Sequence, residues 1–337
     1  SDVYKRQEED GHGEVTSFGA LCTALSATIG TGNIVGVATA IGAGGPGALF
    51  WMEIAAFFGM ATKYSEGLLA VKYRVVDEKH HSLGGPFYYI EKGMGKKWKW
   101  LACLFAFFGV CVGLFGIGTF SQVNGIASAV KNFFDPDTAY AVTIPGIGTY
   151  SWTVVIASLV LSVCVALVLI GGIKRIANVS QVVVPFMAVI YVIFSVLLLV
   201  CNVKQIPAAF VTIVKGAFNP QAVTGGIVGS MIVAMQNGIA RGIFSNEAGL
   251  GTGSIAHACA DTRKPVKQGF FGIFEVFTDT IVICTLTALV ILCSGIPVSY
   301  GAAAGAELTI LGFTSTYGSW VSVFTAVAMC CFAFSTI

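Results

Sequence analysis

The most constraining feature of the chain is a glycine-broken run at residues 26–36, which interrupts an otherwise apolar, membrane-length segment. It reads Ser-Ala-Thr-Ile-Gly-Thr-Gly-Asn-Ile-Val-Gly. A second run of this kind lies far downstream, at residues 237–251. Backbone that leaves the helical conformation at membrane depth persists only where protein or a water-filled cavity satisfies its polar groups. Two such breaks, each opening a set of apolar segments, predict a binding site near the middle of the bilayer.

The composition assigns the chain to a membrane. Of its 337 residues, 55% are hydrophobic and 11% are charged, whereas soluble domains carry about 25% charged residues. The formal net charge is +2, and the sequence has no basic stripe that would bind nucleic acid. Most cysteines lie within apolar runs, without the spacing of a metal site, and we interpret them as small core residues. No cofactor is expected.

Eight segments have the length of a membrane helix, about 20 apolar residues. They are residues 17–42, 47–73, 99–131, 152–172, 180–201, 223–254, 269–294 and 319–337. Residues 84–90 begin with Gly-Gly-Pro and contain paired tyrosines, which favours a short helix at the membrane interface. Residues 294–318 are expected to form a short external helix that caps the site.

Lysine and arginine are distributed unevenly between the two sides. After the second, fourth and sixth segments the sequence contains Lys72, Arg74, Lys79, Lys92, Lys96, Lys97, Lys99, Lys174, Arg175, Arg263, Lys264 and Lys267. The other connections contain Lys131, Lys204 and Lys215. Because positive residues concentrate in cytoplasmic loops, the even-numbered connections are expected to be cytoplasmic. The sequence thus predicts a multi-pass protein of the plasma or inner membrane.

The segments predict one membrane domain at residues 15–337, preceded by a polar segment at 1–14. We interpret residues 1–7 as an artefact of the sequence. Residues 15–201 contain five apolar segments, and the second broken segment opens another unit at 223–337. Because this unit enters the membrane from the opposite side, the two units are expected to form an inverted-topology repeat, with the second unit incomplete.

Four motifs together resemble the alanine or glycine:cation symporter family, which has a leucine-transporter-like fold. They are Gly-Thr-Gly-Asn-Ile at 30–34, Gly-Met-Ala-Thr-Lys-Tyr-Ser-Glu at 59–66, Gly-Gly-Pro-Phe-Tyr-Tyr-Ile at 84–90 and Ser-Asn-Glu-Ala-Gly-Leu-Gly-Thr-Gly-Ser-Ile-Ala-His-Ala at 245–258. The resemblance covers nearly the whole chain after Val15. It implies an all-α polytopic membrane protein with a five-plus-five inverted repeat and broken first and sixth helices. Since the family carries a helix before the first span and more after the eighth, it also implies truncation at both ends.

The first break has three interpretations. A dinucleotide-binding loop needs a preceding strand and a GxGxxG spacing, and the sequence has neither. The small residues would alternatively allow two helices to pack closely. We favour an unwound hinge, at which Thr31, Gly32 and Asn33 meet a substrate carboxylate near the start of a half-helix. The carbonyl groups of Ser26 and Ile29 would then face a sodium ion, which prefers oxygen ligands.

The remaining candidate site residues lie in other segments. Carbonyl groups freed near Ser245 would accept the substrate ammonium group, and Phe244 would close over its side chain, unless Phe244 is ordinary core. The resemblance places Gln122 beside the substrate, although a buried amide also bonds neighbouring helices. It also places Ser335 and Thr336 against the first broken helix. There their hydroxyls would help to hold sodium, with Thr336 also at the substrate, unless they only bond their own helix.

Charged residues within apolar segments are expected to be functional or paired. Lys63 and Glu66 are three residues apart, which predicts a salt bridge along one helix near the cytoplasmic interface. Glu247 and Arg241 are expected either to pair with each other or to bond the broken backbone, in preference to binding the substrate directly.

The sequence therefore predicts a secondary active symporter that imports alanine or glycine by alternating access. Its partners would be the small neutral amino acid, the lipid bilayer and sodium, which acts as the coupling ion. A proton is the alternative ion. Glu275 and Asp279 share one face of the seventh segment, and we interpret them as polar packing or water contacts in preference to a proton relay. An ion channel or a sensor with a transporter fold is a further alternative. An enzyme is disfavoured, since the sequence has no HExxH motif, Cys/His cluster or evident Ser/His/Asp set.

Overall fold

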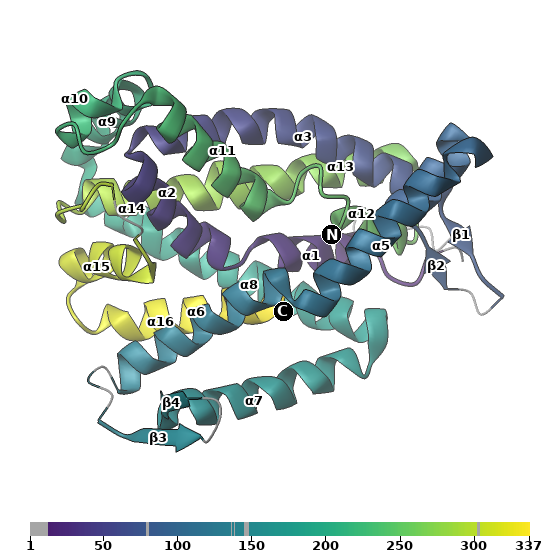
Figure 1. Ribbon diagram of the computed structural model, residues 1–337, viewed down its shortest axis with the longest axis horizontal. Coiled ribbons are helices and arrows are strands. Elements are labelled where there is room, and N and C mark those ends of the chain that lie inside the picture. Colours follow the sequence, from purple (N-terminus) through teal and green to yellow (C-terminus); the bar gives the residue numbers. More distant parts are fainter. Residues whose placement is uncertain (1–12, 79–80, 136, 138, 145–147, 302–303) are drawn as a thin grey trace.

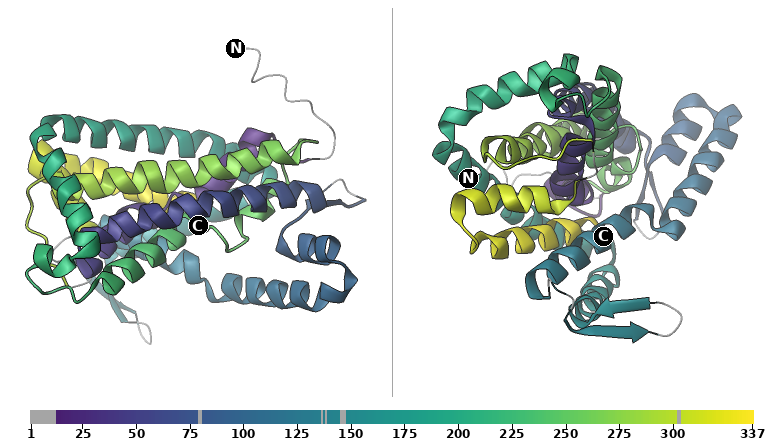
Figure 2. Two further views of the ribbon diagram at one scale, coloured as in Figure 1. Left: turned by 90° about the horizontal axis from the view of Figure 1, so that it is seen from above. Right: turned by 60° about the vertical axis from the view of Figure 1, so that its left-hand side comes forward.

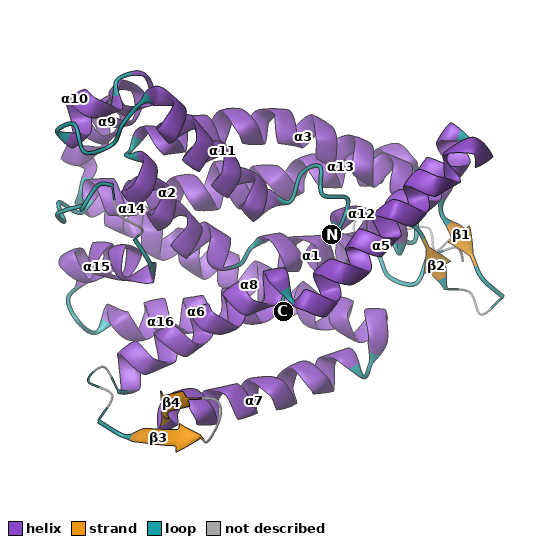
Figure 3. Ribbon diagram, viewed as in Figure 1, coloured by secondary structure: helices purple, strands orange, loops and turns teal. Residues whose placement is uncertain are grey.

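The structure, a computed structural model, describes residues 13–337 except 79–80, 136, 138, 145–147 and 302–303. The described chain is a bundle of helices with two short antiparallel hairpins (Figures 1 and 3). In the hairpins, β1 (Val75–Val76) pairs with β2 (Ser82–Leu83), and β3 (Ala141–Ile144) pairs with β4 (Gly148–Ser151). The predicted polar segment 1–14 lies outside the described residues up to residue 12.

The helices follow one another along the chain with short connections. The first half contains α1 (Ser17–Thr28), the π-helical η1 (Gly32–Gly36), α2 (Val37–Gly44), α3 (Gly47–Tyr73), α4 (Pro86–Tyr89), the π-helical η2 (Ile90–Met94), the 3-10 turn η3 (Lys96–Trp98), α5 (Lys99–Phe115), α6 (Ile117–Phe134) and α7 (Trp152–Leu169). The second half contains α8 (Gly172–Cys201), the 3-10 turn η4 (Val203–Gln205), α9 (Ile206–Phe218), α10 (Pro220–Thr224), α11 (Met231–Asn246), α12 (Gly253–Ala258), α13 (Pro265–Val276), the π-helical η5 (Phe277–Cys284), α14 (Thr285–Cys293), α15 (Ala306–Tyr317) and α16 (Val321–Thr336).

The predicted segments are helical, but some of their boundaries differ. The second segment, 47–73, coincides with α3. The third is divided by Gly116, whose left-handed φ of 58° separates α5 from α6. Helices also form in the two connections predicted to contain short ones, as α4 with η2 and as α15. The helix α9 lies in a connection for which the sequence analysis predicts no element.

Four helical stretches of the described chain are long and apolar enough to cross a membrane: Lys96–Phe134, α7, α8 and Pro265–Cys293. The bent pair of α1 with η1 and α2 makes a fifth, and the direction of the helix axis changes by 49° between its two halves. The prediction of eight spans counts three more. Of these, α3 carries Glu53, Lys63 and Glu66, while α11 and α16 have only 16 residues each. The long apolar helices make this a polytopic membrane protein.

Exposure indicates which helices face lipid. No residue of α7 is buried, and Ala102 is the only buried residue of α5. In contrast, 61% of the most apolar part of Pro265–Cys293 is buried. An apolar helix without a covered face requires an apolar surrounding, so α5 and α7 belong at the lipid boundary and α13 to α14 in the interior.

The interior is built around the first broken helix. In Figures 1 and 2, α3, α11 and α13 run side by side, and α1 and α2 lie between them and the layer of α8 and α16. Glycines bring the first layer unusually close. A Cβ at Gly238 of α11 would lie 2.1 Å from the carbonyl oxygen of Ala48 in α3, and one at Gly272 of α13 would lie 2.5 Å from that of Lys63. Small residues of this kind drive helix packing in membranes.

This packing gives a prediction for Gly238. Replacing it with alanine places a methyl group against the Ala48 carbonyl and is expected to destabilise the protein by about 1–3 kcal/mol, the usual cost of overpacking. The matched control is Gly113→Ala in α5, where an added Cβ meets nothing within 4 Å. The measurement is the midpoint of thermal unfolding in detergent. Equal unfolding midpoints for the two variants would show that α11 can move away from α3 without a loss of stability.

Candidate functional site

The first break spans Ile29 to Thr31, between α1 and η1. Ile29 leaves the helix with an extended backbone (φ −77°, ψ 91°). Two side chains accept the N–H groups released there: Asn33 Oδ1 from Gly30 at 2.8 Å and Gln122 Oε1 from Thr31 at 2.9 Å. Gln122 comes from α6 and is 4% exposed. The predicted hinge is therefore an unwound segment with substituted hydrogen bonds.

The carbonyl groups on the other side of this break face the end of α16. Thr336 Oγ1 lies 2.9 Å from the Ser26 carbonyl oxygen and 3.3 Å from that of Ile29. Ser335 Oγ also lies 3.3 Å from the Ile29 oxygen. Both hydroxyls additionally reach the carbonyl of Phe332 in their own helix, at 2.9 and 3.0 Å. All four residues predicted to hold sodium thus meet at one place, with two carbonyl and two hydroxyl oxygens.

The second break begins later than predicted. The sequence pattern places it at 237–251, but α11 remains helical through Asn246 and the irregular segment is 247–252. Glu247 has a positive φ of 54°, and Gly249 and Gly251 follow with φ of 91° and 80°. Phe244 and Ser245 therefore belong to the last turn of α11. They lie beside the break rather than inside it.

A carboxylate accepts the N–H groups of this second break. Glu66 Oε1 of α3 lies 3.0 Å from the amide nitrogen of Gly249 and 3.2 Å from that of Gly251. Glu247 accepts a hydrogen bond from the hydroxyl of Thr252. Among the ion pairs of the described residues, none joins Glu247 to Arg241. Of the two structural roles expected for Glu247, bonding within the break is closer to what the structure shows. The partner, however, is the side chain of Thr252 and not the backbone.

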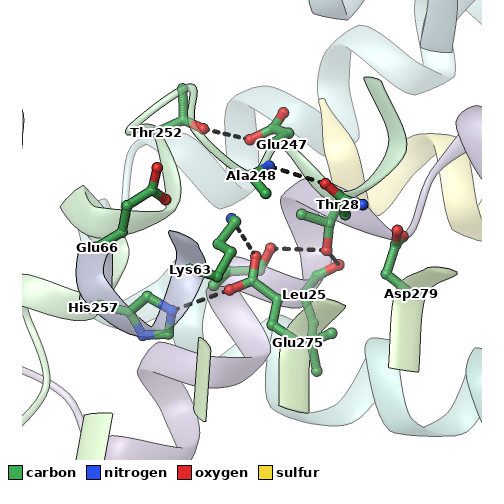
Figure 4. Close-up of polar contacts among 12 residues, drawn as sticks. Leu25, Thr28, Lys63, Glu66, Glu247, Ala248, Thr252, His257, Glu275 and Asp279 are labelled. Atoms are coloured by element: carbon green, nitrogen blue, oxygen red, sulfur yellow. Dashed lines mark hydrogen bonds and ion pairs between the residues drawn. The ribbon is translucent and has the colours of Figure 1, made fainter. Parts of the chain in front are cut away.

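The predicted salt bridge between Lys63 and Glu66 is wrong. Lys63 Nζ instead pairs with Glu275 Oε1 of α13 at 2.7 Å, and both side chains are fully buried. His257 of α12 approaches the other oxygen of Glu275, with Nε2 3.1 Å from Oε2 (Figure 4). The spacing along α3 predicted the wrong partner because Glu66 accepts hydrogen bonds from backbone N–H groups of the second break. Leaving buried donors unpaired costs more free energy than an exposed ion pair contributes.

A second buried carboxylate connects the two breaks. Asp279, in η5, accepts hydrogen bonds from Asn33 Nδ2 at 2.7 Å and from Ser245 Oγ at 2.9 Å. Thr280 donates to it as well, at 2.8 Å. The carboxylate is fully buried. Asp279 and Glu275 therefore make polar contacts between helices, as one of the two interpretations predicts.

The sequence analysis did not recognise Asp279 as a connector. Its only signal is a charged residue within an apolar segment, which marks importance but names no partner. Asn33 and Ser245, which we predict to bind substrate, donate their side-chain hydrogen bonds to this carboxylate, while Asn33 Oδ1 accepts from Gly30.

The remaining predicted residues line two cavities. Thr31, Gly32 and Phe244 line one of about 280 Å³, together with Arg241 of α11 and Glu307 of α15. Ser26, Ser335 and Thr336 line another of about 220 Å³, between α1, α8 and α16. Gln122, Asn33 and Ser245 line neither of these two cavities. The hinge thus separates a cavity with charged groups from a group of four oxygens.

Comparison of the sequence with known proteins identifies its family. The model of the sodium:alanine symporter family matches residues 1–337. The chain belongs to the sodium:alanine symporter family. The resemblance found in the sequence motifs is thereby confirmed.

Individual relatives align over most of the chain. It is 48% identical over 334 residues to an uncharacterized transporter of Haemophilus influenzae, covering 98% of this chain and 69% of the relative. The sodium/alanine symporter AgcS of Methanococcus maripaludis is 43% identical over 337 residues, covering 99% and 70%. GlnT of Bacillus subtilis, described as a probable sodium/glutamine symporter, is 39% identical over 325 residues, covering 96% and 63%. The names of AgcS and GlnT both describe the symport of an amino acid with sodium, whereas the Haemophilus influenzae relative is named only as a transporter.

The buried ion pair gives a prediction about stability. Lys63→Met leaves the Glu275 carboxylate without its ammonium partner and is expected to destabilise the protein by about 3–5 kcal/mol. Lys72→Met, an exposed position on the same helix, is the control. Adding Glu275→Gln to Lys63→Met removes the stranded charge and should recover part of the loss. Unfolding midpoints in detergent measure all three, and a Lys63→Met midpoint equal to that of Lys72→Met would contradict a structural role for the pair.

Proposed function

We propose that the protein is a secondary active symporter that imports alanine or glycine with sodium. The observation that carries this proposal is the double use of the first break. Thr31 and Gly32 line the cavity on one side of the hinge, and the Ser26 and Ile29 carbonyls meet two hydroxyls on the other. One short segment thereby serves both an anion-binding and a cation-binding role.

The cavity suits a small zwitterion. The half-helix that begins at Gly32 directs its N–H end toward the substrate carboxylate. An added Cβ at Gly32 would lie 3.3 Å from Cα of Ser245, so the backbone of the two broken helices comes close and leaves little room. Phe244 closes over the small side chain. Arg241 and Glu307 contribute one charge of each sign, which favours a neutral amino acid over an acidic one.

Sodium fits the four oxygens at the other side of the hinge. Alkali cations prefer carbonyl and hydroxyl ligands, and Ser26, Ile29, Ser335 and Thr336 offer two of each. A bound ion would join α1 to α16 and hold the hinge in the shape that receives the carboxylate. Ion and substrate then increase each other's affinity by the same factor, as linkage requires.

Alternating access would arise from an inverted repeat. The mobile part comprises the broken helices with α3 and α13–α14, and the scaffold comprises α5–α6, α7, α8 and α16. The close glycine packing of α3 against α11 and α13 supports a bundle that moves as one body. The chain would lie in the plasma or inner membrane and enter its first span from the cytoplasm.

Proton coupling is the alternative that a specific contact favours. Asp279 is buried between both breaks, and its hydrogen-bond donors Asn33, Ser245 and Thr280 are all neutral. A carboxylate in such surroundings is a group that carries protons in membrane transporters.

Uptake into proteoliposomes tests the proposal. Alanine should accumulate when a sodium gradient is imposed, and glycine should compete, because the crowded cavity admits a small side chain. Leucine and glutamate should not compete, on grounds of size and charge. Accumulation driven by a proton gradient alone would assign the coupling ion to a proton instead. Sodium flux without alanine would indicate a channel, and equal competition by leucine would remove the small-substrate proposal.

The sodium ligands have a test of their own. Replacing Ser335 and Thr336 together with alanine removes two of four oxygens and should raise the sodium concentration for half-maximal uptake by about tenfold, equivalent to about 1.4 kcal/mol. The control replaces Ser322 and Thr325, whose hydroxyls bond carbonyls of their own helix region. If both double variants keep the original sodium dependence, the hydroxyls of Ser335 and Thr336 serve only the helix.

A further inference from the structure

The short helix after the second break is held by a buried charged cluster that the proposed transport mechanism does not use. Lys63 of α3 and His257 of α12 converge on Glu275 of α13 (Figure 4). Gln268, which precedes Glu275 in α13, contacts the other ring nitrogen of His257. All four residues are 0% exposed. The ring of His257 thus lies between an amide and a carboxylate, and histidine is the side chain that most often serves as a proton switch in proteins.

The hydrogen bonds define the protonation state of this ring. Gln268 Nε2 lies 2.7 Å from His257 Nδ1. An amide nitrogen only donates, so Nδ1 accepts and the ring proton is on Nε2. Nε2 lies 3.1 Å from Glu275 Oε2 and donates to it. In this arrangement His257 is neutral.

The same arrangement strands a polar atom. Within the described part of the chain, the fully buried Gln268 Oε1 has no hydrogen-bond partner. Rotating the amide by 180° exchanges its oxygen and nitrogen, which brings Oε1 to His257 Nδ1 as an acceptor. A doubly protonated ring would then donate to Gln268 on one side and to Glu275 on the other. Both ring nitrogens therefore keep a partner in either protonation state, without movement of the backbone.

Charge balance favours the additional proton. The buried carboxylates of Glu275 and Glu66 both interact with the ammonium of Lys63, and the half-buried carboxylate of Glu247 does so as well. Glu66 Oε2 is a further buried oxygen without a partner among the described residues. Excess charge in a buried cluster costs free energy unless it is paired, and a proton on His257 reduces this excess by one.

The other elements around α12 bring charged groups of both signs close to it. The helix packs against α1, α3 and β2 as well as α13. Neither α1 nor β2 contains a charged residue. Arg74, at the end of α3, donates to the carbonyls of Ala258 and Ala260 beyond the last turn of α12. Other titratable groups around the cluster are Asp279, which interacts with Glu275, Tyr89, beside Glu66 and Ser254, and Glu14, near Cys259.

We propose that His257 is a proton-binding site and that the bound proton fastens α12 to α3 and α13. The binding step adds one proton from water to Nδ1 and breaks no covalent bond. Without this proton, the excess negative charge weakens the contact of α12 with its neighbours. That contact is close at Gly253, because a Cβ added there would lie 2.5 Å from Lys63 Nζ. Any transport step that moves α12 would then depend on the pH at that end. This last consequence rests on the proposed function, while the proton site does not.

Hydrogen–deuterium exchange of the purified protein tests the site without requiring transport. The amides of residues 249–258 are followed from about pH 5.5 to 8.5, a range that brackets histidine titration, with correction for the intrinsic pH dependence of exchange. Protection is expected to fall by about tenfold in one single-proton step as the pH rises, the effect of one shifted pH unit. His257→Gln should lack the step. His81→Gln, in an exposed loop where His81 pairs with Asp77, is the matched control and should retain it.

Gln268→Glu separates a proton site from a merely structural contact. It is isosteric and places a carboxylate against Nδ1, so the midpoint of the step should move upward by about one to three pH units. A purely structural role predicts no such movement. Protection in the original protein that is independent of pH, or a Gln268→Glu midpoint equal to the original, would overturn the proposal. If His257→Gln does not fold, the pH dependence of the original protein and the midpoint of Gln268→Glu still test the proposal. Absence of alanine uptake at every pH would refute the proposed function and leave the exchange result standing.

Discussion

Backbone polar groups released at two helix breaks are the constraint on which the rest of this structure depends. Inside an apolar bundle, each N–H or C=O without a partner costs several kcal/mol. The first break is satisfied by Gln122 from α6 and by hydroxyls at the end of α16. The second is satisfied by Glu66 from α3. Because these partners lie far away in the sequence, satisfying the breaks determines which helices are neighbours.

The chemistry of the partners differs between the breaks, and this difference has a consequence for function. Gln122, Ser335 and Thr336 are neutral groups whose hydrogen bonds a ligand can replace at small cost. Glu66 is a carboxylate that accepts two amide N–H groups, and bonds of this kind are roughly twice as strong as neutral ones. The first break is therefore suited to exchange ligands, and the second is suited to remain fixed to α3. The cavity and the four oxygens both lie at the first break, in agreement with this division.

The sequence was informative where one physical signal dominates. Hydropathy located the helices, and 47–73 matches α3 because Pro46 precedes its first turn and its apolar run ends at Arg74. Glycine density located the breaks, but it misplaced the start of the second. Gly238 remains helical because it is needed for close approach to Ala48, a tertiary contact that looks in sequence like a flexible position. The partners of charged residues could not be predicted for the same reason. Lys63 and Glu66 are neighbours along α3, yet each is committed to a group about 200 residues away.

Coupling between ion and substrate needs an element with two arrangements that both ligands influence. In the proposed symporter this element is the hinge itself, since the carbonyls of Ser26 and Ile29 that face α16 and the cavity-lining residues Thr31 and Gly32 belong to one short segment. Asp279 extends the element to the second broken helix, because Asn33 and Ser245 donate to the same carboxylate. A displacement of the hinge by sodium would change the position of Asn33, and with it the bond that Ser245 shares. The end of α11, where Phe244 lines the cavity, would respond without any longer pathway. In the proposed symporter the two breaks would therefore act as one site, because Asn33 and Ser245 both donate to the buried carboxylate of Asp279.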